Sequence, residues 1–367
     1  MSFTNRLNNL VDQLKRNDLD ALIVTNLKNI YYLTGYFALA GDSIQSFRDP
    51  EAVLMVTKKE LIIMADKRSA GSVKNVKETR FLEFPYPFSH KALDKILSEL
   101  GGVKNVGFEA DSLIYGEAKD LLGGKKYNFI DASEIIKNLR TTKDPQEIEY
   151  LTKAAEVTDL AFQHIVKKIN LGMTEKEISR EIQAFLFKEG DGVAFGPIVA
   201  SGVGSAIPHY RPTDKKIKKG DMLLLDFGGA YKGYLGDMTR TIFLGKPTER
   251  QKEVYNLVLK AQQEALKTIR PGIRASKPHE TVLRFFGTEN LAENFLHGTG
   301  HGVGLNIHEA PSLSPRGDSK IREGMVFSVE PGLYFENWGG VRIEDVVTVT
   351  KDGYRNLTRS SKEMIII

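Results

Sequence analysis

Carboxylates that interrupt apolar, strand-like segments constrain the fold of this chain more than any other feature of its sequence. Asp226 follows the apolar run 222–225 and precedes two glycines, and Glu330 follows the run 325–329 and precedes Pro-Gly. An ionised carboxylate in such a place is costly to desolvate unless a cation or hydrogen bonds compensate it. The chain must therefore fold so that these segments meet a compensating charge.

A third carboxylate, Asp237, is expected to lie beside Asp226. The turn-like segment 230–234 separates the two residues, so a hairpin would bring them together. Adjacent carboxylates repel each other and raise a pKa unless a cation sits between them. The plainer alternative for these two residues alone is a turn aspartate and a salt-bridged aspartate.

The segment 341–347 is expected to form one strand that supplies a fourth carboxylate. Its residues alternate so that Arg342 and Glu344 share one face. Arg342 would then orient a carboxylate from behind, as residues that support metal ligands do. Taken singly, this pair also fits a structural ion pair.

Three of the seven histidines lie in one glycine-rich segment, 295–309. Glycines let the backbone approach a ligand closely where any Cβ would obstruct it. Together with the carboxylates, this segment predicts a site that holds two divalent metal ions and activates a water between them. The residues of the predicted metal site are Asp226, Asp237, His301, Glu330 and Glu344.

The composition excludes several other classes of protein. A net charge of +4, from basic residues scattered along the chain, does not indicate a nucleic-acid partner. The absence of cysteine rules out disulfides and thiolate metal sites. No run of about 18 apolar residues indicates a membrane span, and no apolar signal segment opens the sequence. We expect a soluble cytoplasmic protein.

The length of 367 residues exceeds the usual size of one domain, so two domains are expected. Helix and strand patterns alternate in the first part, which indicates an α/β domain. The pattern breaks near residue 138, and a long helix is expected to begin at Pro145 with Asp144 as its N-cap. Two helices are expected first, to about residue 168 and over 174–189. Strands, a helix over 249–269 and further strands follow, which favours α+β packing.

Five segments carry a resemblance to a known family. They are 226–228, 236–241, 297–304, 330–332 and 341–345. In order and spacing they resemble the metallopeptidases of the prolidase and aminopeptidase P group, whose catalytic domain has the pita-bread fold shared with methionine aminopeptidase and creatinase. The segments 19–24 and 29–35 are similar to the N-terminal domain of that group. The resemblance implies a smaller α/β domain over 1–138 and a pita-bread catalytic domain over 139–367.

The resemblance also implies a role for each residue of the predicted metal site. Asp226 would bind one metal ion, His301 and Glu330 the other, and Asp237 and Glu344 would bridge both. Oxygen-dominated ligation with one imidazole favours Mn²⁺, and Co²⁺ or Zn²⁺ fits the same donors.

Substrate contacts follow from the same resemblance. His209 and His308 would face the substrate, where they hydrogen-bond the oxyanion or donate to the departing nitrogen, with His297 in support. Glu330 would relay the proton. Arg316 is a candidate anchor for the carboxylate of a dipeptide, and a solvated loop residue is the equal alternative.

The function implied is removal of an N-terminal residue before proline, as a dipeptidase or an aminopeptidase, by a homodimer. Two alternatives stay open: a hydrolase of another small amide on the same fold, and a peptide-binding relative without catalysis. Methionine aminopeptidase fits less well because some 138 residues precede the catalytic part.

Overall fold

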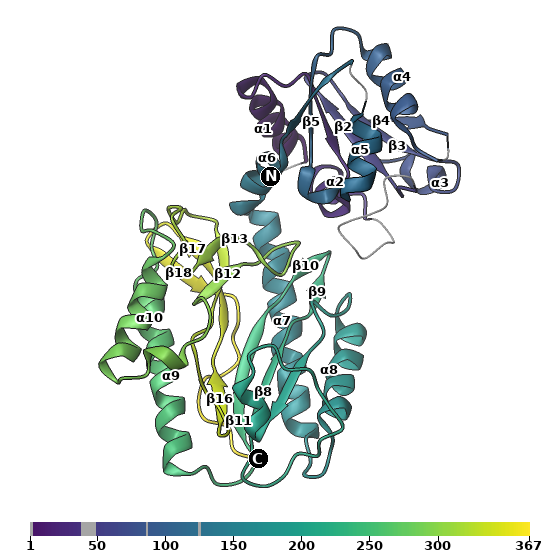
Figure 1. The fold of residues 1–367 in the computed structure, drawn as a ribbon. Helices are drawn as coiled ribbons and strands as arrows, with labels where there is room; N and C mark the ends of the chain where they lie inside the picture. The colour runs from purple at the N-terminus through teal and green to yellow at the C-terminus, as the bar shows by residue number, and fades with distance from the viewer. Residues whose placement is uncertain (1–2, 38–48, 86, 124–125) are drawn as a thin grey trace. The chain divides into compact units, whose positions relative to one another are not determined.

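The computed structural model describes residues 3–37, 49–85, 87–123 and 126–367. The chain forms two compact units, Met1–Arg140 and Thr141–Ile367 (Figure 1). The boundary predicted near residue 138 falls inside α6 (Ser133–Thr141). In the part of the chain that the structure describes, no helix has the length and apolarity needed to cross a membrane.

The N-terminal unit is built on a six-stranded mixed sheet. In spatial order its strands are β4 (Thr79–Glu83), β3 (Leu61–Ala65), β2 (Val53–Thr57), β1 (Ala21–Val24), β5 (Asn105–Phe108) and β6 (Asn128–Asp131). β1 pairs antiparallel with β2 and parallel with β5. The other helices are α1 (Phe3–Arg16), α2 (Leu27–Thr34), α3 (Ala70–Val73), α4 (His90–Leu100), η1 (Ala110–Ser112) and α5 (Tyr115–Leu122). The predicted α/β pattern is confirmed.

The C-terminal unit has two halves, each of two helices followed by antiparallel strands. The first half contains α7 (Pro145–Lys168), α8 (Glu175–Glu189), β7 (Ile198–Ser201), η2 (Gly202–Ala206), β8 (Met222–Phe227), β9 (Ala230–Tyr231), β10 (Tyr234–Leu235) and β11 (Met238–Phe243). The second contains α9 (Glu249–Lys267), α10 (Lys277–Thr288), η3 (Ala292–Asn294), β12 (Gly300–Gly302), β13 (Glu309–Leu313), β14 (Val326–Val329), β15 (Gly332–Phe335), β16 (Gly339–Arg342), β17 (Asp345–Thr350) and β18 (Gly353–Asn356).

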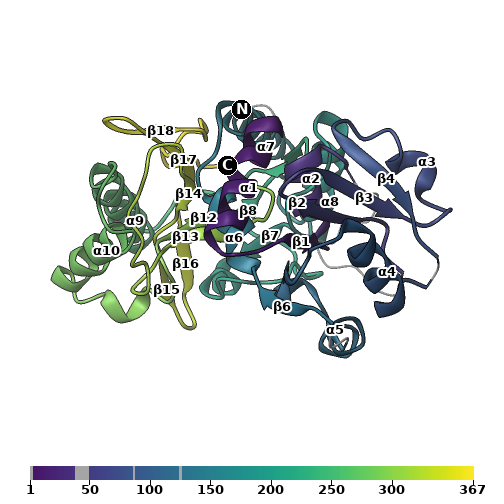
Figure 2. The same ribbon diagram turned by 90° about the horizontal axis from the view of Figure 1, so that it is seen from above.

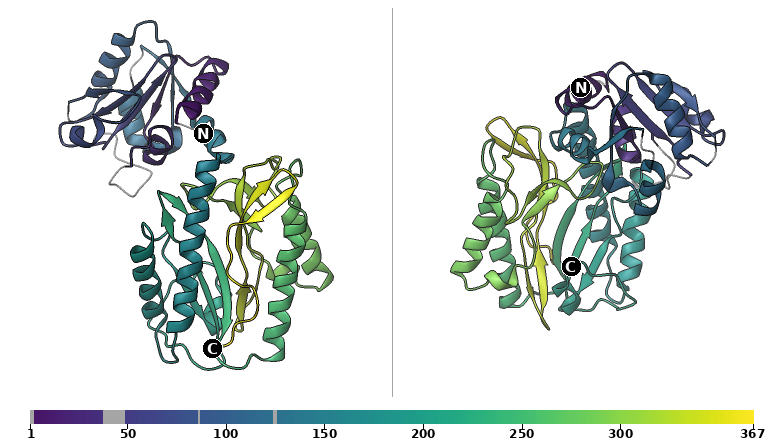
Figure 3. Two further views of the ribbon diagram at one scale, coloured as in Figure 1. Left: turned by 180° about the vertical axis from the view of Figure 1, so that it is seen from behind. Right: turned by 45° about the horizontal axis from the view of Figure 1, so that its top comes forward.

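The helix pairs lie on opposite sides of the strands of this unit. Figure 3 shows α7 and α8 on one side and α9 and α10 on the other, and Figure 2 shows α9 and α10 together beside β14 and β16. Each pair covers its own apolar core, with Ile182 and Leu225 in the first and Val258 and Phe327 in the second. The strands between the helix layers therefore present their other face to a shared interior. This is the predicted α+β arrangement.

The start of α7 agrees with the prediction. Asp144 accepts hydrogen bonds from the backbone of Gln146 and Glu147, and the Glu147 side chain accepts one from the Asp144 backbone. Such a reciprocal cap satisfies amide groups that the first turn of a helix leaves free. α10, in contrast, was not predicted.

The predicted hairpin between Asp226 and Asp237 is confirmed. β8 and β11 pair antiparallel with Asp226 opposite Thr239. The β9–β10 ribbon forms the connection between them. The register therefore places Asp237, which directly precedes β11, beyond the end of β8 and close to Asp226.

The prediction of one continuous strand over 341–347 is wrong. β16 ends at Arg342 and pairs with β15, whereas β17 begins at Asp345 and pairs with β14 and β18. The chain changes sheet at Ile343 and Glu344, where the Glu344 amide donates to the Thr239 carbonyl at 3.1 Å. A backbone hydrogen bond to β11 therefore stands where a continuous strand would have bonded to its neighbour in the same sheet.

Candidate metal centre

A cavity of about 350 Å³ in the C-terminal unit contains all five residues of the predicted metal site. They reach it from β8, from the residue before β11, from β12 and from the residues that follow β14 and β16. The residues that line the cavity are Phe195, Ile198, Pro208, His209, Asp226, Asp237, His297, Gly298, Gly300, His301, Ile307, His308, Ser312, Ser314, Glu330, Arg342 and Glu344.

Asp237, His301 and Glu344 form a close group in this cavity. Each offers one ligand atom, and these atoms all lie within 4.8 Å of one another. Asp237 and Glu344 are buried, with 5% and 1% of their surface exposed. Two buried carboxylates at this distance repel each other, and a divalent cation would remove that repulsion.

Glu330 completes the group from the end of β14. Its Oε1 lies 3.2 Å from Nε2 of His301 and accepts a hydrogen bond from the Ser328 hydroxyl at 3.0 Å. The Ser328 hydroxyl also accepts from the His301 amide at 3.1 Å. Ser328 therefore fixes both side chains, a contact that nothing in the sequence pattern indicated.

Asp226 is held in place by a hydrogen bond from Arg342. The Arg342 guanidinium donates to Oδ2 of Asp226, to the Tyr334 hydroxyl at 2.7 Å and to the Thr239 hydroxyl at 3.0 Å. The Thr239 hydroxyl in turn donates to Oε2 of Glu344 at 2.6 Å. Arg342 therefore contacts Asp226 directly and Glu344 through the Thr239 hydroxyl, although it does not share one strand with Glu344 as the alternation had predicted.

Tyr334 and Thr239 were missed in the sequence. Tyr334 also contacts Nε2 of His297 at 2.8 Å, so it links His297 to Arg342. Only their spacing offered a signal, because Tyr334 lies four residues after Glu330 and Thr239 two residues after Asp237. Such proximity in the sequence does not predict which hydroxyl group faces the site.

Two buried oxygens show that the cavity fits cations. Among the described residues, Oδ1 of Asp226 and Oε1 of Glu344 are buried without a hydrogen-bond partner. A buried carboxylate oxygen left unpaired is expensive. Both atoms belong to side chains that line the cavity, and hard divalent cations prefer such ligands. The donor set therefore fits divalent metal ions.

The pKa shifts of the residues in the metal-free site also indicate that the site fits cations. Burial raises the pKa of Asp237 and of Glu344 well above the ordinary values, and the neighbouring carboxylates raise both further. Burial lowers the pKa of His301, but its hydrogen bond to Glu330 and the carboxylate charges outweigh this and raise it to about 9. Burial raises the pKa of Glu330, yet His301 more than offsets that effect and lowers it to about 2. Without metal, the site therefore retains protons.

This proton uptake predicts how the stability of the metal-free protein depends on pH. Folded His301 keeps its proton up to about pH 9, whereas the unfolded imidazole loses it near 6.5. The folded state therefore binds more protons between these values, so the free energy of unfolding falls as pH rises through them. The raised pKa values of Asp237 and Glu344 act in the same direction. The His301 contribution is at most about 3 kcal/mol.

Urea denaturation of chelator-treated protein at several pH values measures this slope. Protein loaded with metal should lack it, because bound cations keep the ligands deprotonated. A metal-free protein with constant stability from pH 6.5 to 9 contradicts the expectation.

The predicted substrate residues divide into two groups. His209, His297 and His308 line the cavity. The His308 ring packs edge-on against His301 with centroids 4.2 Å apart, and burial lowers the pKa of His308 and of His297. Arg316, in contrast, is exposed and does not line the cavity. Its role as a carboxylate anchor stays a prediction.

The fold and the site together define a hydrolase that uses divalent metal ions, and comparison with known proteins agrees. The model of metallopeptidase family M24 matches residues 149–351, and that of the creatinase/prolidase N-terminal domain matches residues 6–142. The chain belongs to metallopeptidase family M24. It is a metallopeptidase that acts on peptides, with the predicted pita-bread fold.

Three relatives extend over the whole chain. A Xaa-Pro dipeptidase of Pyrococcus horikoshii is 35% identical over 364 residues, with 98% of each chain covered. The structure of a Xaa-Pro dipeptidase from Bacillus anthracis superposes with a TM-score of 0.91 at 34% identity and covers 100% of both chains. That of an X-Pro aminopeptidase from Thermotoga maritima has a TM-score of 0.87 at 31% identity and covers 97% of this chain and 100% of its own.

Proposed function

We propose that this protein hydrolyses the peptide bond between an N-terminal residue and proline, as a Xaa-Pro dipeptidase or aminopeptidase. The observation that carries the proposal is the convergence of four carboxylates and one histidine, from distant segments, on one cavity that contains two unpaired buried oxygens. Relatives named for both activities support it.

We assign the five residues as those that would hold two divalent cations. When bound, such a pair supplies Lewis acidity to the scissile carbonyl and acidifies the attacking water. Glu330 would accept a proton from the attacking water and pass it to the departing nitrogen. His301 keeps Glu330 in place, since their side-chain atoms lie 3.2 Å apart.

His209 and His308 serve the substrate side of the cavity in this proposal. The lowered pKa of His308 keeps its imidazole neutral at pH 7, so that its N–H donates to the oxyanion without adding charge. The imide before proline lacks an N–H, so the amino end, the carbonyl and the ring must position the substrate. Phe195, Ile198 and Ile307 give the cavity an apolar wall for that ring.

The proposal predicts a strict requirement for proline and for metal. Protein loaded with Mn²⁺ should cleave Ala-Pro or Ala-Pro-Ala at least ~1,000-fold faster than chelator-treated protein. Ala-Ala and Ala-Ala-Ala, in which an alanine with a backbone N–H replaces proline, should be cut much more slowly. Liquid chromatography of the released alanine measures all four rates, and parallel reactions with Co²⁺ and Zn²⁺ compare the metals.

The same experiment separates the alternatives. Cleavage of Ala-Pro alone defines a dipeptidase, and cleavage of the tripeptide defines an aminopeptidase. Metal-loaded protein that leaves both proline peptides intact contradicts the proposal. It would favour a hydrolase of another small amide or a non-catalytic binding protein.

We also propose Mn²⁺ as the metal, a homodimer as the assembly and the cytoplasm as the compartment, with no nucleic-acid or membrane partner. The mixed oxygen and imidazole donors support Mn²⁺, and the family resemblance supports the homodimer. Light scattering at twice the mass of one chain tests the assembly.

A further inference from the structure

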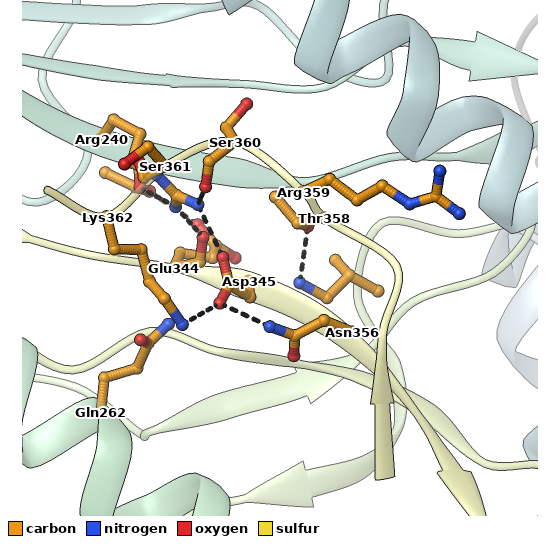
Figure 4. Close-up of polar contacts among 12 residues, drawn as sticks. Arg240, Gln262, Glu344, Asp345, Asn356, Thr358, Arg359, Ser360, Ser361 and Lys362 are labelled. Carbon is orange, nitrogen blue, oxygen red and sulfur yellow. Dashed lines mark hydrogen bonds and ion pairs between the residues drawn. The ribbon is translucent and has the colours of Figure 1, made fainter.

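Arg240 lies in β11, three residues after Asp237, and is almost completely buried. All five N–H groups of its guanidinium are used, which is the full capacity of an arginine. They donate to the carbonyls of Thr239 (2.9 Å), Glu344, Ser360 (2.7 Å) and Ser361 (3.0 Å) and to Oδ1 of Asp345 (2.7 Å) (Figure 4). One side chain therefore joins β11, the junction of β16 and β17, and the C-terminal segment.

Asp345 neutralises this buried arginine. It is 1% exposed. Its Oδ2 accepts from Nζ of Lys362 at 2.6 Å and from the side-chain amide of Asn356 at 3.3 Å (Figure 4). The Arg240–Asp345 pair is therefore fully desolvated. Such a pair often stabilises a fold no more than an apolar pair of the same size does.

The C-terminal segment is attached at further places, among them the Tyr255 hydroxyl, which donates to the carbonyls of Lys362 and Glu363. Asp159 of α7 accepts hydrogen bonds from the backbone of Arg359 and from the backbone and hydroxyl of Ser360. Beyond that, Phe243 of β11 exchanges backbone hydrogen bonds with Ile365 and Ile367. Residues 359–367 therefore run beside β11, the strand that follows Asp237.

We propose that Arg240 and Asp345 are positioning residues of the metal centre, with the C-terminal segment as part of the same network. Arg240 binds the backbone carbonyl of Glu344 directly, and the Glu344 amide donates to Thr239 in β11. The network thus sets the separation of Asp237 and Glu344, two of the five residues assigned as metal ligands. This inference rests on the proposed metal centre.

Arg240→Lys tests the inference, because lysine keeps the charge but has three N–H donors where arginine has five. Mn²⁺ and Co²⁺ are titrated by calorimetry into chelator-treated protein, and the visible absorption of bound Co²⁺ reports ligand geometry. We expect the affinity for metal to fall 10- to 100-fold, as for other residues that orient ligands, with a changed Co²⁺ spectrum.

Arg359→Lys is the matched control. Arg359 is an exposed arginine of the same segment that contributes only its backbone amide to the network, and Figure 4 shows its side chain directed away from Asp345. The control should bind both metals as the unsubstituted protein does. A residue with a purely structural role would lower the melting temperature and leave the affinity and the Co²⁺ spectrum unchanged.

The outcomes separate this inference from the proposed function. Unsubstituted protein that binds neither metal contradicts the metal centre itself. Unsubstituted protein that binds metal, with an unchanged affinity in folded Arg240→Lys, overturns the positioning role alone. If Arg240→Lys does not fold, Lys362→Met decides instead, since Lys362 is partly exposed and only its bond to Asp345 is lost. A loss of affinity of about tenfold or more supports the inference, and an unchanged affinity overturns it.

Discussion

Asp237→Asn is expected to abolish catalysis and, at the same time, to stabilise the metal-free protein. The amide is a far weaker ligand than the carboxylate, and the Asp237 ligand atom lies within 4.8 Å of those of His301 and Glu344. We expect kcat/KM to fall more than ~1,000-fold, because even residues that only orient ligands change activity ~10- to 100-fold.

The gain in stability has an electrostatic cause. Burial and the charges of Glu344 and Asp226 raise the pKa of Asp237, so ionised Asp237 destabilises the metal-free fold. Removal of that charge should raise the free energy of unfolding at pH 8 by about 1 kcal/mol or more. Urea denaturation with chelator present measures the gain, and peptide hydrolysis with Mn²⁺ measures the loss.

Asp214→Asn is the control for this substitution. Asp214 is an exposed aspartate paired with Lys176 at 2.7 Å on the surface, and exposed pairs contribute at most about 1 kcal/mol. The control should change neither property. An Asp237→Asn protein that is active, or that is less stable than the unsubstituted protein without metal, contradicts the assigned role.

Gly300→Ala is expected to destabilise the protein strongly. A Cβ at this position would lie 1.9 Å from the Ser328 carbonyl oxygen, so backbone must move. That movement separates β12 from β14 and therefore His301 from Glu330. We expect the free energy of unfolding to fall by at least about 3 kcal/mol, at the upper end of the range for overpacking, and affinity for metal to fall with it.

Gly287→Ala provides the comparison. Gly287 lies in α10 with nothing within 4 Å of the added methyl group, and alanine is favoured over glycine in a helix. The control should be as stable as the unsubstituted protein or slightly more stable. A Gly300→Ala protein of unchanged stability would mean that β12 and β14 do not pack as closely as described.

The sequence by itself determined the local elements and the candidate residues of the site. Hydrophobic periodicity indicated an alternation of helices and strands in the N-terminal unit, and the cap at Asp144 predicted the start of α7. The interruption of apolar runs by Asp226 and Glu330 identified segments that require a compensating charge. These signals are local, because burial period and capping depend on residues a few positions apart.

Only the tertiary structure decided which side chains meet. It broke the expected strand at Glu344, brought Tyr334 between His297 and Arg342, and left Arg316 outside the cavity. Arg240 and Ser360 are 120 positions apart in the chain, yet they share a hydrogen bond. Such contacts depend on sheet register and on where the chain passes between sheets. A pattern of alternating residues specifies which face of a strand is buried, but not the strand or segment that packs against that face.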